Sequence, residues 1–187
     1  MTGSPLSARL TEGLVVPPGA GRVLSAKAQH VTYKVTGEHS ASASTFEVLV
    51  PPGFDVGAHS HAHSEELFYV LEGELEVLAF EPRVRTPDSW RSWESHAGQR
   101  RITATPGTLI QVPHGCPHAF ANTGGATAKM LFQSSPPPAH ERYFEELLDI
   151  LTSGAQSAER DAAIDALRAR YDIEQITPLR YDPPAPQ

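Results

Sequence analysis

Two stretches of sequence decide the fold: G-F-D-V-G-A-H-S-H-A-H-S-E-E-L-F-Y-V-L-E-G at residues 53–73, and G-T-L-I-Q-V-P-H-G-C-P-H-A-F-A-N at residues 107–122. Each combines histidines with a short run of β-branched and aromatic residues, which is typical of a strand. Together they contain three imidazoles and one carboxylate: His59, His61, Glu66 and His118. Such a donor set suits one divalent transition metal ion.

The spacing of these four donors supports their convergence on one ion. His59 and His61 are two residues apart, so on a strand their side chains point to the same face, with Cα atoms roughly 6.6 Å apart. Two imidazoles at that separation can both reach an ion at about 2.0–2.1 Å. Glu66 follows after a short turn, and His118 comes just after a proline and a glycine that bend the chain. Three neutral imidazoles and one carboxylate leave the ion a net positive charge and open positions for substrate or dioxygen.

The first two-thirds of the chain reads as short strands separated by glycine- and proline-containing turns. The predicted strands cover residues 31–35, 44–50, 67–71, 75–80, 101–104, 108–112 and 128–133. Because no helical pattern separates them, an antiparallel sandwich or barrel is favoured over a parallel sheet. We therefore predict an all-β barrel over residues 1–135, including its N-terminal strands.

The pattern changes to helical after the segment S-S-P-P-P at residues 134–138. Apolar residues one turn apart predict an amphipathic helix that ends near residue 153: Tyr143, Phe144, Leu147, Leu148 and Leu151. A second helix is predicted from about Ala158 to Tyr171, with Ser157 as its N-cap. The proline-rich tail from Pro183 is predicted to be disordered. We expect residues 136–187 to form a helical extension and tail that pack on the same domain.

Composition and charge exclude several classes of protein. The 187 residues carry a formal net charge of -7, and no run of Lys or Arg offers a surface for nucleic acid. The single cysteine, Cys116, permits no intrachain disulfide, which is consistent with a reducing compartment. The first residues lack the apolar core of a signal peptide, and no window approaches the length of a membrane span. We expect a cytoplasmic protein without a nucleic-acid or membrane partner.

Both stretches resemble the cupin family. The first matches the pattern G-x5-H-x-H-x4-E-x6-G and the second matches G-x5-P-x-G-x2-H-x3-N. Every defined position is filled, the last one by the only asparagine of the chain, Asn122. The resemblance implies the cupin double-stranded β-helix, a jelly-roll barrel, here followed by C-terminal α-helices. It also implies metal ligation by the set His59, His61, Glu66 and His118.

Other histidines and the cysteine are weaker candidates. His63 and Glu65 share strand parity with His61, so these three residues form an alternative donor set. The sequence distances to Gly53 and Gly73, which bound the first motif, favour the set with His59, His61 and Glu66. His63 is then expected at the rim. His114 is expected to face solvent, with substrate orientation as the alternative, and Cys116 is expected to pack as a small side chain. Four histidines have no partner spacing and no assigned role: His30, His39, His96 and His140.

The resemblance extends beyond the motifs, over roughly residues 15–150, to single-domain bacterial cupins similar to quercetin 2,3-dioxygenase. The segments V-T-Y-K-V-T-G-E and F-E-V-L-V-P-P-G and the aromatic and acidic helix near residues 143–146 carry it. It implies a dioxygenase that acts on a flavonol-like, enolisable or phenolic small molecule. Glu66 would be both a ligand and the catalytic group that accepts the enolic proton, and burial is expected to raise its pKa. The donor set accommodates Fe, Ni, Cu, Co, Mn or Zn.

A flat aromatic substrate requires an apolar pocket beside the ion. Four aromatic residues are candidates for its lining: Phe46, Phe68, Tyr69 and Phe120. Phe120 shares strand parity with His118 and is therefore the best of them. Each of the four can also be read as core packing.

The segment Glu81–Arg101 separates the two motifs by more than a tight hairpin needs, and it carries Trp90 and Trp93 among polar residues. Three interpretations stay open: a lid or mouth loop over the pocket, a contact with a partner subunit, or a surface excursion whose tryptophans lie on the barrel. Exposed barrel edges and the apolar helix at residues 143–151 favour a homodimer.

Two other functional classes also stay open. An isomerase, decarboxylase or dehydratase would use the ion as a Lewis acid and Glu66 to move a proton, without dioxygen. A non-catalytic cupin would bind a small molecule only, because the fold alone does not establish an activity.

Overall fold

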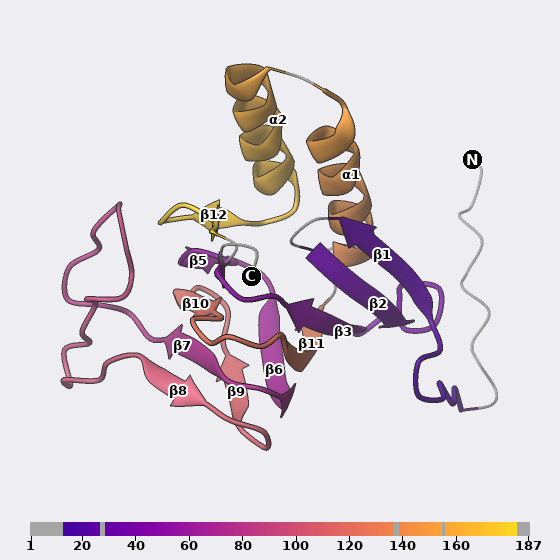
Figure 1. Ribbon diagram of the computed structural model, residues 1–187, viewed down its shortest axis with the longest axis horizontal. Helices are drawn as coiled ribbons and strands as arrows, with labels where there is room; N and C mark the ends of the chain where they lie inside the picture. Colours follow the sequence, from indigo (N-terminus) through magenta and orange to yellow (C-terminus); the bar gives the residue numbers. More distant parts are fainter. Residues whose placement is uncertain (1–12, 27–28, 137–138, 155, 183–187) are drawn as a thin grey trace.

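The computed structural model describes residues 13–26, 29–136, 139–154 and 156–182. The tail from Pro183, which was predicted to be disordered, lies outside these ranges. So do the first twelve residues of the predicted barrel. Two antiparallel sheets face each other, and two helices lie side by side at one end of them (Figure 1). The strands are β1 (Arg22–Ala26), β2 (Gln29–Val35), β3 (Ser44–Val50), β4 (Phe54–Asp55), β5 (His59–Ser60), β6 (Glu65–Glu72), β7 (Leu75–Ala79), β8 (Ile102–Ala104), β9 (Leu109–Val112), β10 (His118–Ala121), β11 (Ala128–Ser135), β12 (Glu174–Gln175) and β13 (Arg180–Tyr181).

The strand order identifies a double-stranded β-helix. The first sheet has the order β1-β2-β3-β11-β6-β9. The second has the order β12-β5-β10-β4-β13, with β7 paired to β10 and β8 paired to β7. All of these pairings are antiparallel. The predicted all-β cupin fold with C-terminal helices is therefore confirmed.

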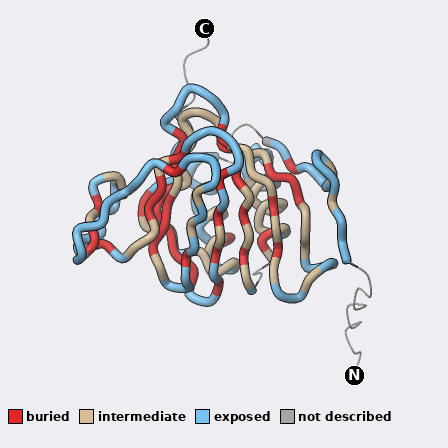
Figure 2. Tube along the Cα trace, turned by 90° about the horizontal axis from the view of Figure 1, so that it is seen from below, coloured by how far each residue is buried: buried red, intermediate tan, exposed pale blue. Residues whose placement is uncertain are grey.

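Alternation along the strands builds the core between the sheets. On β6, Glu66, Phe68 and Val70 are buried, whereas the residues between them are more exposed, because successive side chains point to opposite faces. Figure 2 shows the same alternation along neighbouring strands, with exposed residues gathered at the turns. Phe46 and Phe132 stack across β3 and β11 with ring centroids 5.5 Å apart, so aromatic packing joins the central strands of the first sheet.

The segment between β7 and β8 is a packed surface excursion. Trp90 and Trp93 are 1% and 3% exposed and pack against Leu78 and Ala119 on the outer side of the second sheet. Trp90 Nε1 donates a hydrogen bond of 2.8 Å to Asp55 Oδ1. The two tryptophans thus lie on the barrel, as the surface-excursion interpretation expects, and a contact of this segment with a partner subunit stays a prediction.

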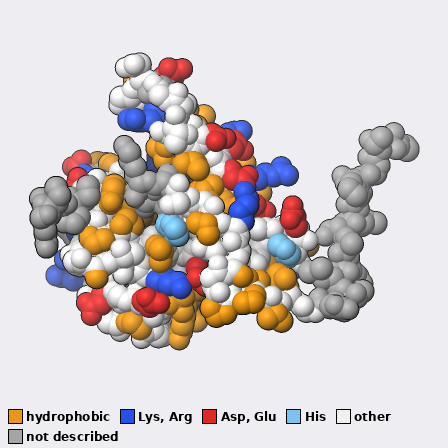
Figure 3. Space-filling model, turned by 45° about the vertical axis from the view of Figure 1, so that its right-hand side comes forward, with side chains coloured by type: hydrophobic (Ala, Val, Ile, Leu, Met, Phe, Trp, Pro, Cys, Tyr) orange, Lys and Arg blue, Asp and Glu red, His pale blue; other side chains and the backbone are white. Residues whose placement is uncertain are grey.

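The arginines of the excursion are paired with carboxylates. Arg85 bonds Glu81 at 2.7 Å, and Arg100 bonds Glu94 at 2.6 Å. Arg91 and Arg101 both bond Glu76 on β7, at 3.1 and 3.0 Å. On the described part of the face seen in Figure 3, Lys and Arg side chains are interspersed with Asp and Glu and form no continuous basic area.

The C-terminal region consists of α1 (His140–Thr152), α2 (Ser157–Arg170) and the strands β12 and β13. Ser157 is the first helical residue and Gln156 is the N-cap, without a side-chain capping bond, so the predicted cap was wrong by one position. Phe144 and Leu148 of α1 pack against the core of the first sheet. None of the described helices is both long and apolar enough to cross a membrane.

The two last strands were not predicted. β12 pairs with β5, and β13 pairs with β4, so the end of the chain adds to the second sheet. Thr177 between them is 2% exposed and accepts the amide of Ala58 through Oγ1 at 2.7 Å. The extension is thus part of the barrel wall, with β12 beside β5, the strand that carries His59.

Candidate metal centre

Strand pairing brings the four predicted donors together from both sheets. His118 on β10 lies directly opposite His59 on β5. His61 follows β5, and Glu66 comes from β6 in the other sheet, where it faces inward. One ligand atom from each of the four residues lies within 4.8 Å of the others, and all four side chains are buried. The structure therefore places the whole predicted set at one point.

Backbone carbonyl groups orient all three imidazoles in the same way. His59 Nδ1 lies 3.0 Å from the Gly57 oxygen, His61 Nδ1 lies 2.9 Å from the Asp172 oxygen, and His118 Nδ1 lies 3.1 Å from the Cys116 oxygen. Since a carbonyl oxygen only accepts, each Nδ1 must carry the proton. In the neutral imidazole, Nε2 then keeps its lone pair, and that is the state in which histidine binds a metal.

The centre of the set fits a cation. Nε2 of His61 is buried without a hydrogen-bond partner among the described residues, although it lies 3.1 Å from Glu66 Oε1, because the two groups are not aligned for a hydrogen bond. Nε2 of His118 lies 3.0 Å from Glu66 Oε2. With Nδ1 protonated, the Nε2 lone pair of a neutral imidazole faces the carboxylate, so a positive charge between them, either a proton on Nε2 or a metal ion, satisfies both groups.

Burial and mutual charge set the pKa values of these groups. Burial lowers the pKa of His59 well below its usual value, and His118 and His61 lower it further. Burial also acts to lower the pKa of His61, but the Glu66 carboxylate outweighs it and the net direction is upward. For Glu66, burial acts to raise the pKa, but His61 and His118 outweigh it and hold the pKa well below its usual range. The predicted rise of the Glu66 pKa was therefore wrong.

The alternative donor set of His61, His63 and Glu65 is not assembled. The side chain of His63 is 84% exposed, and its Nδ1 lies 3.1 Å from Asp172 Oδ1. Glu65 is half exposed and points outward, 3.9 Å from the exposed His114. Cys116 is half-buried, and burial raises its thiol pKa, as expected for a packed small side chain.

Two residues of the second stretch hold its ends in place. The amide of Gly115, where φ is +75°, donates to the His61 oxygen at 2.6 Å, so the turn before His118 is attached to the first donor segment. Asn122 donates through Nδ2 to the oxygens of Val50 and Ala126 and accepts the Gly124 amide. Its side chain ties the end of β10 to the end of β3.

A cavity of about 450 Å³ opens onto the donor set. The cavity lies between the first sheet, α1 and the segment that carries β12 and β13, and its wall is mostly aliphatic and aromatic. Its volume is in the range of small-molecule sites. Histidines aside, the charged side chains among its described lining residues are Glu66 and Arg160, and all of those lining residues lie outside the excursion.

The aromatic residues predicted for the pocket take three different positions. Phe68 and Phe120 line the cavity, next to His59 and His61. Phe46 is fully buried behind Phe132 and is not among the lining residues. Tyr69 is 37% exposed and points to the outer face of β6.

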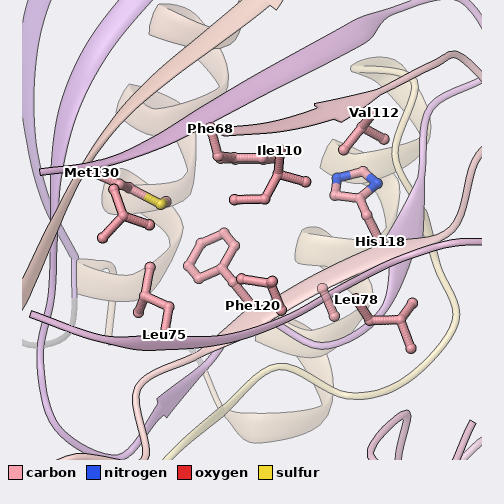
Figure 4. Close-up of a pocket in the computed structure, with 11 residues that line it drawn as sticks. Phe68, Leu75, Leu78, Ile110, Val112, His118, Phe120 and Met130 are labelled. Carbon is pink, nitrogen blue, oxygen red and sulfur yellow. The ribbon is translucent and has the colours of Figure 1, made fainter. Parts of the chain in front are cut away.

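Below the site the barrel is closed. Figure 4 shows Phe120 and Phe68 between His118 and the apolar side chains of Leu75 and Met130. The space left among these side chains is about 10 Å³, room for at most one water. Among the described residues, the larger cavity is therefore the space from which a ligand can reach the donor set.

One residue beside the donors was assigned no role from the sequence. His140, the first residue of α1, is 3% exposed and lines the cavity. Its Nε2 lies 3.6 Å from Glu66 Oε1, and burial lowers its pKa to about 4. No motif spacing signalled it, because only the packing of α1 brings residue 140 to Glu66.

Comparisons with known proteins found one curated relative and several solved structures with a similar fold. A relative from Methanocaldococcus jannaschii, described as an uncharacterized protein, is 31% identical over 98 residues, which cover 52% of this chain and 64% of that protein. The chain thus spans less than two thirds of the length of this curated relative. A predicted oxalate decarboxylase from Thermotoga maritima has a TM-score of 0.50 at 18% identity, covering 65% of this chain and 98% of the other. KdgF from Halomonas sp. has a TM-score of 0.46 at 15% identity, covering 62% and 87%.

The family assignment rests on a match that spans most of the chain. The family model described as Cupin matches residues 10–153, a range that includes both donor stretches. The buried group His59, His61, Glu66 and His118 is typical of the metal site of that family. This chain belongs to the cupin family.

Proposed function

We propose that this protein is a metal-dependent oxygenase of quercetinase type, which acts on a flavonol-like, enolisable or phenolic small molecule. One observation carries the proposal: a mostly apolar cavity of about 450 Å³ opens directly onto His59, His61 and Glu66 of the donor set. The protein would thus bring an apolar molecule and a metal ion together in a site that excludes water.

The donor residues have separate tasks. His59, His61 and His118 would hold the ion through Nε2, and their Nδ1 bonds to main-chain oxygens keep the rings in place. A divalent ion bound there would act as a Lewis acid on a substrate oxygen. Glu66 would hold the ion through one carboxylate oxygen and accept the enolic proton on the other, as the catalytic base.

The cavity favours an apolar substrate over a small polyanion. Recognition of a phosphate or of a dicarboxylate uses arginine or lysine side chains in fixed positions. Of the described lining residues, Arg160 is the one such side chain; it belongs to α2 and is partly exposed. Around the donors the wall is instead built from aromatic rings, including Phe68, Phe120 and Phe132.

Oxygen uptake tests the proposal. Protein freed of metal would be reloaded separately with Fe(II), Ni(II), Co(II), Mn(II), Cu(II) or Zn(II), and oxygen consumption would be followed with quercetin and with 3-hydroxyflavone. We expect uptake with at least one redox-active ion and none with zinc or with the His61→Ala variant. The absence of uptake with every ion and both compounds would contradict the proposal.

The alternatives have distinct outcomes in the same assay. Substrate conversion under strict anaerobic conditions would assign an isomerase, decarboxylase or dehydratase, with Glu66 as the proton-moving group. Ligand binding of equal affinity with and without metal, in the absence of any conversion, would assign a non-catalytic binding protein.

A further inference from the structure

His140 lies beside the donor set without belonging to it. Its ring centroid is 5.7 Å from that of His61, and its Nε2 is 3.6 Å from Glu66 Oε1, longer than a hydrogen bond. The same carboxylate oxygen lies 3.1 Å from His61 Nε2. Glu66 Oε1 therefore lies between Nε2 of the metal donor His61 and the imidazole of His140.

His140 also has unused hydrogen-bonding capacity. Its Nδ1 is buried and has no partner among the described residues. The three donor histidines differ, because each places Nδ1 on a main-chain oxygen. Ser134 Oγ is likewise buried and unpartnered, but Ser134 is not among the residues that line the cavity. A buried polar atom without a partner is costly, and a bound ligand is one way in which a protein satisfies it.

The start of α1 is firmly attached to the first sheet, so His140 has a defined position. Glu141, the next residue, accepts the Tyr33 hydroxyl on its main-chain oxygen at 3.0 Å. Its carboxylate accepts the Gly37 amide and the Ser44 hydroxyl, each at 3.1 Å. A side chain held in this way is suited to orient a ligand.

The surroundings of His140 indicate the shape of that ligand. Phe132 meets its ring nearly perpendicularly, at 88° and 5.3 Å, and Phe144 lies 5.9 Å away. Tyr143 lines the same part of the cavity. Aromatic walls of this kind favour a flat apolar body, and the imidazole adds one hydrogen bond at its edge.

We propose that His140 is a ligand-binding residue: it hydrogen-bonds the second of two oxygens on neighbouring carbons of a flat aromatic ligand, whose first oxygen is held at the donor set. The inference rests on the proposed function, because it takes the cavity as the ligand site. It narrows the ligand class to compounds with adjacent oxygen substituents, such as hydroxy-ketones of the flavonol type.

Equilibrium binding to zinc-loaded protein under argon tests this assignment apart from oxygen chemistry. The probes are 3-hydroxyflavone and flavone, which lacks the hydroxyl group, and the method is isothermal titration calorimetry. The variants are His140→Phe, His140→Asn, which keeps an amide nitrogen near Nδ1, and His140→Gln, which keeps one near Nε2. The exposed His96→Phe is the control, and zinc affinity is measured for each variant by chelator competition.

We expect His140→Phe to weaken 3-hydroxyflavone binding about five- to tenfold, the effect of one lost hydrogen bond, with zinc affinity unchanged. His140→Asn should keep most of the affinity for 3-hydroxyflavone, and flavone should bind weakly to all variants. Unchanged binding in His140→Phe would overturn the proposal, as would failure of 3-hydroxyflavone to bind the unaltered protein. A parallel loss of zinc affinity restored by Gln would also overturn it, by showing that His140 acts through Glu66. Binding that depends on His140 without any oxygen uptake would instead overturn the oxygenase and leave this assignment intact.

Discussion

The main-chain oxygen of Asp172 lies 2.9 Å from Nδ1 of His61, so a residue that follows the last helix orients the donor that comes directly after β5. The Asp172 carboxylate secures this contact, since it accepts the amides of Ala62 at 3.1 Å and His63 at 2.8 Å. With φ at +58°, Asp172 is in the left-handed region, which Asp and Asn tolerate better than most residues.

Replacement of Asp172 should therefore affect metal affinity. Asp172→Ala removes both accepted amide bonds and strains the left-handed position, and we expect the metal dissociation constant to rise about tenfold, as for other outer contacts of metal ligands. Asp172→Asn keeps one side-chain oxygen and tolerates the same φ, so its affinity should lie between those of the unaltered protein and Asp172→Ala. Chelator competition measures all three, and an unchanged affinity in Asp172→Ala would refute the role.

Removal of one donor imidazole should abolish stoichiometric metal binding. His61→Ala leaves two imidazoles beside a buried carboxylate, and we expect less than a tenth of the metal content of the unaltered protein after dialysis, consistent with the role of complete donor sets in metal sites. His63→Ala is the matched control, because its side chain is 84% exposed and lies outside the set. Elemental analysis gives the metal content of both variants. Equal metal content in His61→Ala and His63→Ala would exclude a metal site at the four donors.

The excursion should contribute to stability through Trp90. Trp90→Phe keeps most of the buried ring but removes the Nε1 bond of 2.8 Å to the Asp55 carboxylate, and we expect a loss of about 1.5–3 kcal/mol in unfolding free energy. Trp93→Phe removes a bond of the same length to the Thr86 hydroxyl, a neutral acceptor, and should cost about 1 kcal/mol. Urea unfolding at neutral pH gives both values. A larger loss of unfolding free energy in Trp93→Phe than in Trp90→Phe would show that the charge of Asp55 does not strengthen its hydrogen bond with Trp90.

Glu76 should make part of the stability dependent on pH. Burial acts to raise its pKa, but the hydrogen bonds from Arg101 and Arg91 outweigh it and hold the pKa below its usual 4.5. A carboxyl whose pKa is lower in the folded state stabilises that state above pH 4.5, and the contribution disappears as the pH falls through the folded pKa. Because both arginines are about 40% exposed, solvent screening limits the effect.

We expect Glu76→Gln to lower the unfolding free energy by roughly 0.5–1 kcal/mol at pH 7, and the difference from the unaltered protein to shrink steadily below pH 4.5. Unfolding curves in urea at a series of pH values measure it. Glu81→Gln is the control, because its pair with Arg85 is more exposed and should contribute less. A difference that grows toward low pH would contradict the sign of the shift.

Local patterns were sufficient for much of this protein. Runs of β-branched and aromatic residues between turn residues predicted β3 at its observed bounds, all of β7, β8 and β9, and most of β2, β6 and β11. Short strands such as β4, β5, β12 and β13 have two residues each, too few to show any period. β4 and β5 form because the longer strand β10 offers them main-chain hydrogen bonds, and β12 and β13 pair in turn with β5 and β4.

The donor set was readable from the sequence because three of its four members lie within eight residues, from His59 to Glu66, and the fourth lies in a motif of its own. Spacing along a strand determines which side chains share a face, so this information is present in the linear chain. Contacts between distant segments leave no such trace. His140 beside Glu66, Asp172 behind His61, and the apolar cavity under α1 exist only because the helices return the chain to the barrel, and their positions depend on packing rather than on any local period.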